Sequence, residues 1–221
     1  MDILFEDVIR EAAPGLKVVT VEADVKNSET TDELWALLEK SAADICELLE
    51  MADINKRPGI SATRAAYKAL GKEPNRYRPS SEALCRRIVK GMGLYRINTL
   101  VDVINLISVQ SGYSIGGFDL GKISGETLTL GAGYENEPFE GIGRGLLNIA
   151  HLPVYRDAIG GIGTPTSDNE RTKLDLDTSR LLMCINIYGE EMPVDDVVGL
   201  TVSLIEKFAD ATNIKVNIHT L

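Results

Sequence analysis

The chain has 221 residues, a formal net charge of −10 and 44% hydrophobic residues, which suits one globular domain, with two lobes at most. No apolar run approaches the roughly 18 residues of a membrane span, and the acidic start Met1–Asp7 excludes a secretory signal. Three widely spaced cysteines without a Cys-x-x-Cys pair argue against a disulfide framework or a zinc site. We therefore expect a cytoplasmic protein, and we assign it no metal and no cofactor.

The first half of the chain is expected to be mainly helical. A helix over residues 1–13 precedes a strand from Lys17 to Ala23, which is rich in β-branched valines. The helical spacing of apolar residues, together with capping and glycine signals, predicts three further helices, at residues 31–51, 61–70 and 79–91.

The second half is expected to be mixed. A helix from Asn98 to Gln110 is followed by a turn-rich bend over Gly112–Leu120 and by the glycine-rich, turn-forming segment 131–145. Strands are predicted at residues 126–130, 152–156, 180–188 and 215–219, and a helix at 194–212. This order favours a mixed, layered α/β fold. We divide the chain into residues 1–76, an N-terminal strand and helices packed on the main domain, and residues 77–221, the main domain.

The helix Asn98–Gln110 is apolar on nearly all sides and is therefore expected to be buried. Its polar residues Asn98, Asp102 and Asn105 follow one another at intervals of four and three, so they form one narrow stripe. Buried polar side chains must be hydrogen-bonded or must face a polar ligand. We interpret Asn98 or Thr99 as the helix cap and Asp102 as a residue near the positive helix end. For Asn105, a structural role and a site role both remain open.

The segment from Lys72 to Arg96 holds seven basic and two acidic residues in an otherwise acidic chain. Two interpretations remain open. Either its arginines pair with the surplus acids of the chain, or the segment contacts a few phosphates of an RNA. The RNA-binding interpretation selects Arg76, Arg78, Arg86, Arg87, Lys90 and Arg96.

Several spaced motifs carry a family resemblance. They are Tyr77-Arg78-Pro79-Ser80-Ser81-Glu82-Ala83-Leu84, Arg96-Ile97-Asn98-Thr99-Leu100-Val101-Asp102-Val103-Ile104-Asn105, Gly112-Tyr113-Ser114-Ile115-Gly116-Gly117-Phe118-Asp119-Leu120 and Glu170-Arg171-Thr172-Lys173. In order and spacing, residues 77–188 are similar to the B3/B4 domain, the editing and tRNA-binding domain of the phenylalanyl-tRNA synthetase β subunit. The chain also resembles free-standing bacterial B3/4-domain proteins. The resemblance implies a layered α/β domain like that B3/B4 domain.

In those synthetases the domain hydrolyses tyrosine wrongly attached to phenylalanine tRNA. A pocket for an apolar side chain rejects an added hydroxyl by only about 100-fold, so a second site must recognise the hydroxyl. By this resemblance, Asn105 and Glu170 are the polar residues of the pocket, and Glu170 recognises the tyrosine hydroxyl. Gly160-Gly161 resembles a glycine pair where backbone approaches the ligand closely.

One departure from the family concerns Gly116, which, next to Gly117, stands where the family has a histidine. We expect both glycines to lie at the substrate site. The two histidines of the chain, His151 and His219, are interpreted as a loop residue and a surface residue. No catalytic residue is therefore assigned, and a ribose hydroxyl of the substrate could still assist the attacking water. No aminoacylation motif is present, so a complete synthetase is not expected.

Three hypotheses about function remain. The first is RNA binding at the 3′ end of an aminoacylated tRNA, with aminoacyl-tRNA deacylase activity that edits mischarged tyrosyl-tRNA(Phe) in trans. The second is a non-catalytic module that binds a free aromatic amino acid or another small metabolite, favoured by the missing histidine and the net charge of −10. The third is a vestigial structural or partner-binding module. No membrane partner is expected, and the oligomeric state stays open.

Overall fold

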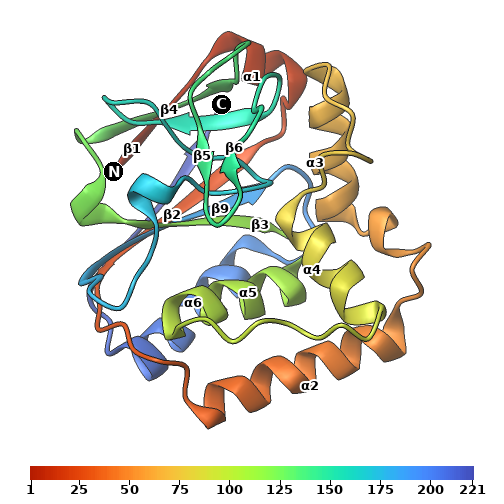
Figure 1. The fold of residues 1–221 in the computed structure, drawn as a ribbon, viewed down its shortest axis with the longest axis vertical. Coiled ribbons are helices and arrows are strands. Elements are labelled where there is room, and N and C mark those ends of the chain that lie inside the picture. Colours follow the sequence, from red (N-terminus) through yellow and green to blue (C-terminus); the bar gives the residue numbers. More distant parts are fainter.

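The computed structural model describes all residues, 1–221, as two four-stranded sheets and six α-helices (Figure 1). The strand orders are β1-β4-β7-β8 and β10-β2-β9-β3, and β1 and β4 are the only parallel neighbours. The strands of the sheets are β1 Asp2–Phe5, β2 Lys17–Asp24, β3 Ser114–Asp119, β4 Thr127–Ala132, β7 Pro153–Arg156, β8 Gly161–Gly163, β9 Arg180–Ile187 and β10 Thr212–Thr220.

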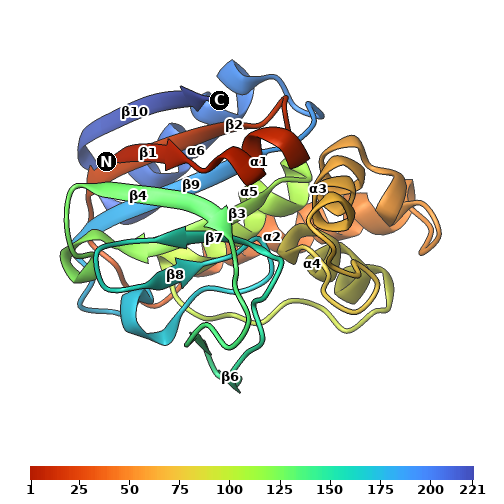
Figure 2. The same ribbon diagram turned by 90° about the horizontal axis from the view of Figure 1, so that it is seen from above.

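A small hairpin, formed by β5 (Glu140–Gly141) and β6 (Gly145–Leu146), belongs to neither sheet. Figure 2 shows that it projects from the body of the molecule. None of the helices is both long and apolar enough to cross a membrane. The helices are α1 Asp7–Ala12, α2 Asp32–Leu48, α3 Pro58–Ala69, α4 Ser80–Val89, α5 Thr99–Ser111 and α6 Val194–Ala209.

The sheet that contains β2 and β9 is the middle layer of the fold. Side chains alternate between the two faces of a strand. Val19 and Met183 therefore pack against α2, α5 and α6, whereas Val18 and Leu182 pack against the other sheet. Figure 1 shows this order, with α2, α5 and α6 below and β1 and β4 above. The predicted mixed, layered α/β fold is confirmed.

Two predicted segments are wrong. Residues 1–13 are not one helix, because residues 2–5 pair with β4 as an edge strand and only α1 follows. The bend expected at 112–120 contains β3, which pairs with β9 along its whole length. Gly116 and Gly117 look like turn residues, but a Cβ at 117 would lie 2.3 Å from Cδ1 of Ile104. Glycine here allows close packing rather than a turn.

The N-terminus of α5 is capped as expected. Oδ1 of Asn98 accepts a hydrogen bond from the backbone N–H of Val101 at 3.0 Å. Asp102 is completely buried, and its carboxylate accepts hydrogen bonds from the Thr30 hydroxyl and the Ile97 backbone. Two of the three polar residues of the stripe therefore hold the start of the helix in place.

The other end of α5 is fixed by Arg57. Its guanidinium donates to the carbonyl oxygens of Val109 and Gln110 at 2.8 and 3.1 Å, and it forms a 2.6 Å ion pair with Glu191. Gly112 ends the helix in the left-handed conformation, with φ of 75°. Both ends of α5 are therefore anchored, which leaves the middle of the helix as a rigid wall for the residues around it.

The first 76 residues contribute strands to both sheets, since β1 pairs with β4 and β2 lies between β9 and β10. The division of the chain at residue 76 stays a prediction.

Candidate functional site

A cavity of about 220 Å³ lies where α5 meets β3, α4 and the segment that follows β8. This is less than the roughly 300–1,000 Å³ of pockets for drug-sized ligands, so it suits one group of amino-acid size. Its polar lining residues are Ser80, Asn105, Ser108, Asp168 and Lys173, and the others are Leu84, Ile97, Val101, Ile104, Ile115, Gly117, Ile142 and Leu174.

Asn105 is the polar residue that α5 supplies to the cavity. It is half-buried, whereas Asn98 and Asp102, earlier in the same stripe, are buried. The hydroxyls of Ser108 and Ser111 donate to backbone carbonyls, but the Asn105 amide makes no hydrogen bond within the protein. Its donor and acceptor groups are therefore free for a ligand.

Asp168, on the segment after β8, lines the same cavity. One carboxylate oxygen, Oδ2, accepts a hydrogen bond from the backbone N–H of Gly117 at 3.2 Å, and this is its one hydrogen bond. Lys173, the one cation of the lining, forms an ion pair with Glu170 instead. Burial raises the pKa of Asp168 to about 7, and the bond from Gly117 offsets only part of this rise. The carboxyl group is therefore poised between its charged and neutral forms at neutral pH.

Glycines make room for this carboxyl group. A Cβ at Gly163 would lie 2.8 Å from Oδ1 of Asp168, and one at Gly116 would lie 3.7 Å from the same atom. Both hypothetical Cβ atoms would also lie 2.6 Å from Cζ of the buried Phe118 ring. A larger side chain at position 116, such as the histidine expected from the family resemblance, would therefore require the ring to move.

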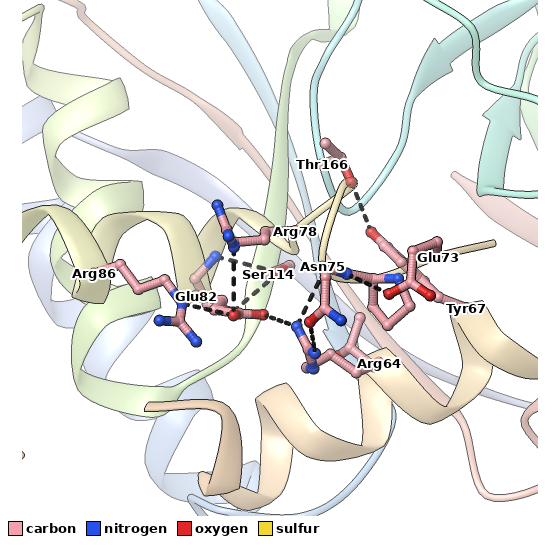
Figure 3. A network of polar contacts seen from close by, with 12 residues as sticks. Arg64, Tyr67, Glu73, Asn75, Arg78, Glu82, Arg86, Ser114 and Thr166 are labelled. Carbon is pink, nitrogen blue, oxygen red and sulfur yellow. Dashed lines mark hydrogen bonds and ion pairs between the residues drawn. The ribbon is translucent and has the colours of Figure 1, made fainter. Parts of the chain in front are cut away.

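The loop 164–168 that carries Asp168 is tied to two helices. The hydroxyls of Thr166 and Tyr67 lie 2.9 Å apart, which links the loop to α3 (Figure 3). The carbonyl oxygen of Pro165 accepts a 2.7 Å hydrogen bond from the backbone N–H of Ser80, the first residue of α4. The loop is therefore held in place without a ligand, and so is the carboxyl group at its end.

A buried ion-pair cluster around Glu82 positions α4. The Glu82 side chain is fully buried and accepts hydrogen bonds from Arg64 Nη1 at 2.8 Å and Arg86 Nε at 2.7 Å. Nε of Arg78 lies 3.8 Å away (Figure 3). Arg64 belongs to α3, so the cluster locks α4 onto α3 and fixes the cavity wall that α4 provides.

The structure brings some of the residues selected from the sequence together, but not all of them. Asn105 and Gly117 line the cavity, and Gly116 lies behind Asp168. Glu170 does not line it. This side chain is partly exposed, and the hydrogen bond from Lys173 lowers the pKa of its carboxyl.

Gly160 and Gly161 also lie outside the cavity. The backbone N–H of Gly160 donates to Oδ1 of Asp157, which pairs with Arg171, and Gly161 packs near the Phe139 ring. The sequence reasoning missed Asp168. The feature of the sequence that could have indicated it is a carboxylate two residues before Glu170, directly after the turn-forming segment Thr164–Ser167.

The basic segment is only partly neutralised. Arg78 and Arg86 contact Glu82, and Arg96 pairs with Asp32 at 2.8 Å. The other three residues selected as RNA contacts form no ion pair, and one of them, Arg87, stacks on the Tyr95 ring at 3.9 Å. Pairing with acids thus accounts for three of the six residues selected as RNA contacts. The two remaining unpaired residues, Arg76 and Lys90, are both exposed.

The fold and the cavity define a small α/β domain with space for one bound group beside its most buried helix. The chain belongs to the B3/4 domain family, because the sequence model of that family matches residues 62–192, more than half of the chain. All residues that line the cavity lie within the matched segment.

Among solved structures, an N-terminal fragment of the phenylalanyl-tRNA synthetase β subunit from Pyrococcus horikoshii is similar, with 13% sequence identity and a TM-score of 0.48. The match covers 97% of this chain and 50% of that fragment, so this chain spans about half of the fragment's length. No curated protein sequence matches the chain.

Proposed function

We propose that this protein binds the aminoacyl end of a tRNA, with the amino-acid side chain in the cavity between Asn105 and Asp168, and hydrolyses the ester when that side chain carries a hydroxyl group. Membership of the B3/4 family supports the class of substrate. The observation that carries the proposal is Asp168, a carboxyl group in a mostly apolar cavity with one hydrogen bond and no ion pair, since Lys173 pairs with Glu170.

Recognition of the hydroxyl follows from the unsatisfied capacity of this carboxyl group. A buried acceptor that lacks a donor is costly, and a ligand hydroxyl at Asp168 removes that cost. Phenylalanine offers no such donor, so its complex leaves the carboxyl group unpaired and dry. A site that is built to bind a hydroxyl rejects the analogue without it far better than an apolar pocket rejects an extra hydroxyl. The cavity therefore favours tyrosine over phenylalanine.

Hydrolysis requires a water molecule activated near the ester. No histidine or cysteine lines the cavity, and the Ser108 hydroxyl is engaged with the carbonyl of Tyr113. We assign the assisting role to the free ribose hydroxyl beside the ester. Water adds to the ester carbonyl, the bond to the ribose oxygen breaks, and the proton of the water passes to that oxygen. The products are free tyrosine and uncharged tRNA, and the protein contributes selection and orientation.

The test is amino-acid release from tyrosyl- and phenylalanyl-tRNA(Phe) by the wild type, Asp168→Asn and Asn105→Ala. The wild type is expected to release tyrosine faster than phenylalanine, and both variants are expected to lose most of that preference. Equal release of the two amino acids by the wild type, or an unchanged preference in Asp168→Asn, would refute the proposal.

A second candidate function is binding of a free aromatic amino acid without catalysis. It is favoured by the net charge of −10 and by the pairing of Arg78, Arg86 and Arg96 with acids, since both weaken attraction of RNA. A thermal-shift measurement with L-tyrosine distinguishes the two, because a ligand at 100 times its dissociation constant stabilises the fold by about 2.7 kcal/mol. Stabilisation by L-tyrosine without retention or hydrolysis of tRNA selects the second candidate.

A further inference from the structure

A second hollow, of about 180 Å³, lies against the same loop that carries Asp168. Ser167 faces this hollow, and the next residue, Asp168, faces the cavity. The β5–β6 hairpin spans both in the same way, since Ile142 lines the cavity and Arg144 lines the hollow. The hollow and the cavity are therefore neighbours, separated by one loop and one hairpin.

The hollow contains two arginines without acidic partners. Of the twelve arginines of the chain, eight lie within 4.0 Å of a carboxylate oxygen, but Arg76 and Arg144 do not. No aspartate or glutamate lines the hollow. The chain has a net charge of −10, so two guanidinium groups without acidic partners in one hollow form an unusual local positive charge. This charge favours binding of an anion.

The groups around these arginines suit an oxyanion. Nη1 of Arg144 donates to the Ser167 hydroxyl at 3.2 Å, which holds the guanidinium at the edge of the loop. Arg76 lies over the Tyr77 ring, 5.6 Å from its centre, and the Asn148 side chain completes this side of the hollow. Planar guanidinium groups bind phosphate oxygens in pairs of hydrogen bonds, and a phosphate between Arg76 and Arg144 would meet donors from both.

We propose that this hollow binds a backbone phosphate of the RNA whose aminoacyl end occupies the cavity. The inference rests on the proposed function, and it adds a contact that fixes the register of the RNA strand without reading its bases. A phosphate held behind loop 164–168 places the terminal nucleotide on the cavity side of the loop. The ester then reaches the mouth of the cavity while the amino-acid side chain points to Asp168.

The test is binding of the single-stranded RNA ACCA, followed by fluorescence anisotropy between 50 and 200 mM salt. One neutralised phosphate on a single strand predicts a slope of about −0.7 in log affinity against log salt, which is a loss of about 2.6-fold over this range. Arg76→Gln and Arg144→Gln are each expected to weaken binding and to reduce the magnitude of the slope, because each removes one of the two cations that hold the phosphate. Arg180→Gln is the matched control, because Arg180 also lacks an ion pair but lines a different hollow, with Glu22 and Asp24.

The proposal is overturned if Arg76→Gln and Arg144→Gln bind ACCA like Arg180→Gln. Adenosine 5′-monophosphate is the second probe. If it binds as tightly as ACCA and loses affinity in the same two variants, the hollow serves a free nucleotide, and the assignment to RNA is wrong. The result also separates the two proposals. If the wild type shows no preference for tyrosine but Arg76→Gln and Arg144→Gln lose RNA affinity, only the proposed function of the cavity is refuted. If the wild type prefers tyrosine but the two variants keep full RNA affinity, only the phosphate site is refuted.

Discussion

Glu82 and Asp168 are two enclosed carboxylates that the fold treats in opposite ways. Glu82 is completely buried and lies among three arginines, one of them from a neighbouring helix. Asp168 has one backbone hydrogen bond, no ion pair and an open side towards the cavity. A paired buried charge joins elements of structure, whereas an unpaired one costs stability and persists where a ligand completes it. The difference in ion pairing between the two carboxylates therefore indicates the position of the site more precisely than the cavity alone does.

Removal of Glu82 is expected to have the largest effect on stability. Glu82→Ala leaves Arg64 and Arg86 without their acceptor, and breaking a buried ion pair typically costs about 3–5 kcal/mol. We expect a loss of this size in the free energy of unfolding, measured by urea denaturation. Glu47→Ala, at an exposed acid on α2, is the control and should change it by less than about 0.5 kcal/mol. Equal losses in the two variants would remove the distinction between paired and unpaired carboxylates.

Asp168→Asn is expected to act in the opposite direction. The folded-state pKa of about 7 lies above the ordinary value of 3.8, so the folded state binds this proton more tightly than the unfolded state does. The contribution of Asp168 to stability is therefore complete below about pH 4 and is lost as the pH rises to about 7. Asparagine does not titrate, so the variant should match the wild type near pH 4 and exceed it by up to about 4 kcal/mol at pH 8.

Urea denaturation at a series of pH values measures this difference. Asp44→Asn, at an exposed residue of α2, serves as the control and should change the free energy of unfolding by less than about 0.5 kcal/mol. A variant Asp168→Asn that is less stable than the wild type at pH 8 would mean that the carboxylate is stabilised where it lies, as Glu82 is.

A methyl group at Gly116 tests the packing behind Asp168. Its Cβ would lie 2.6 Å from the Phe118 ring, so Gly116→Ala forces a buried side chain to shift and should cost about 1–2 kcal/mol. Gly199→Ala is the contrast, because Gly199 is exposed in α6 with no atom within 4 Å of the new Cβ. That variant should gain about 0.5–1 kcal/mol from helix propensity. Thermal unfolding of the two proteins gives the comparison, and equal midpoints would contradict it.

Asn105→Ala is expected to change stability least. The side chain makes no hydrogen bond within the protein, so the free energy of unfolding should fall by less than about 0.5 kcal/mol. Binding of L-tyrosine methyl ester should weaken about fivefold, because one hydrogen bond contributes about 1 kcal/mol. Gln110→Ala, at an exposed residue of the same helix, should leave this affinity unchanged. A large loss of stability in Asn105→Ala would assign the residue to the core instead.

Much of the fold could be predicted from local patterns. The β-branched valines of β2 and the helical spacing of the leucines of α2 indicate their elements, and Thr31 and Asn98 cap helices where the sequence places them. Two segments could not be predicted this way, because their structure depends on distant partners. β1 exists through its parallel pairing with β4, and the glycines of β3 are explained by the close approach of α5 and the segment after β8.

The site shows the same limit. Asn105 was found because a polar residue in an apolar helix is visible in the sequence. Asp168 sits in a polar loop where a carboxylate is ordinary, and only the folded chain places it beside glycines, in a cavity and without an ion pair. Glu170, two residues away, looks equivalent in the sequence, but Lys173 holds it at the partly exposed outer side. The free amide of Asn105 and the unpaired carboxyl of Asp168 meet only in three dimensions.

The most direct measurement is the pKa of Asp168, obtained from the ¹³C shift of its carboxyl carbon by NMR and assigned with Asp168→Asn. We predict a midpoint near 7 in the free protein, since burial raises the pKa of this group to about 7. Saturating L-tyrosine methyl ester should lower the midpoint, because a donated hydroxyl stabilises the charged form. A midpoint near 4 in the free protein, or one that the ester leaves unchanged, would contradict the role of Asp168 as the group that recognises the ligand.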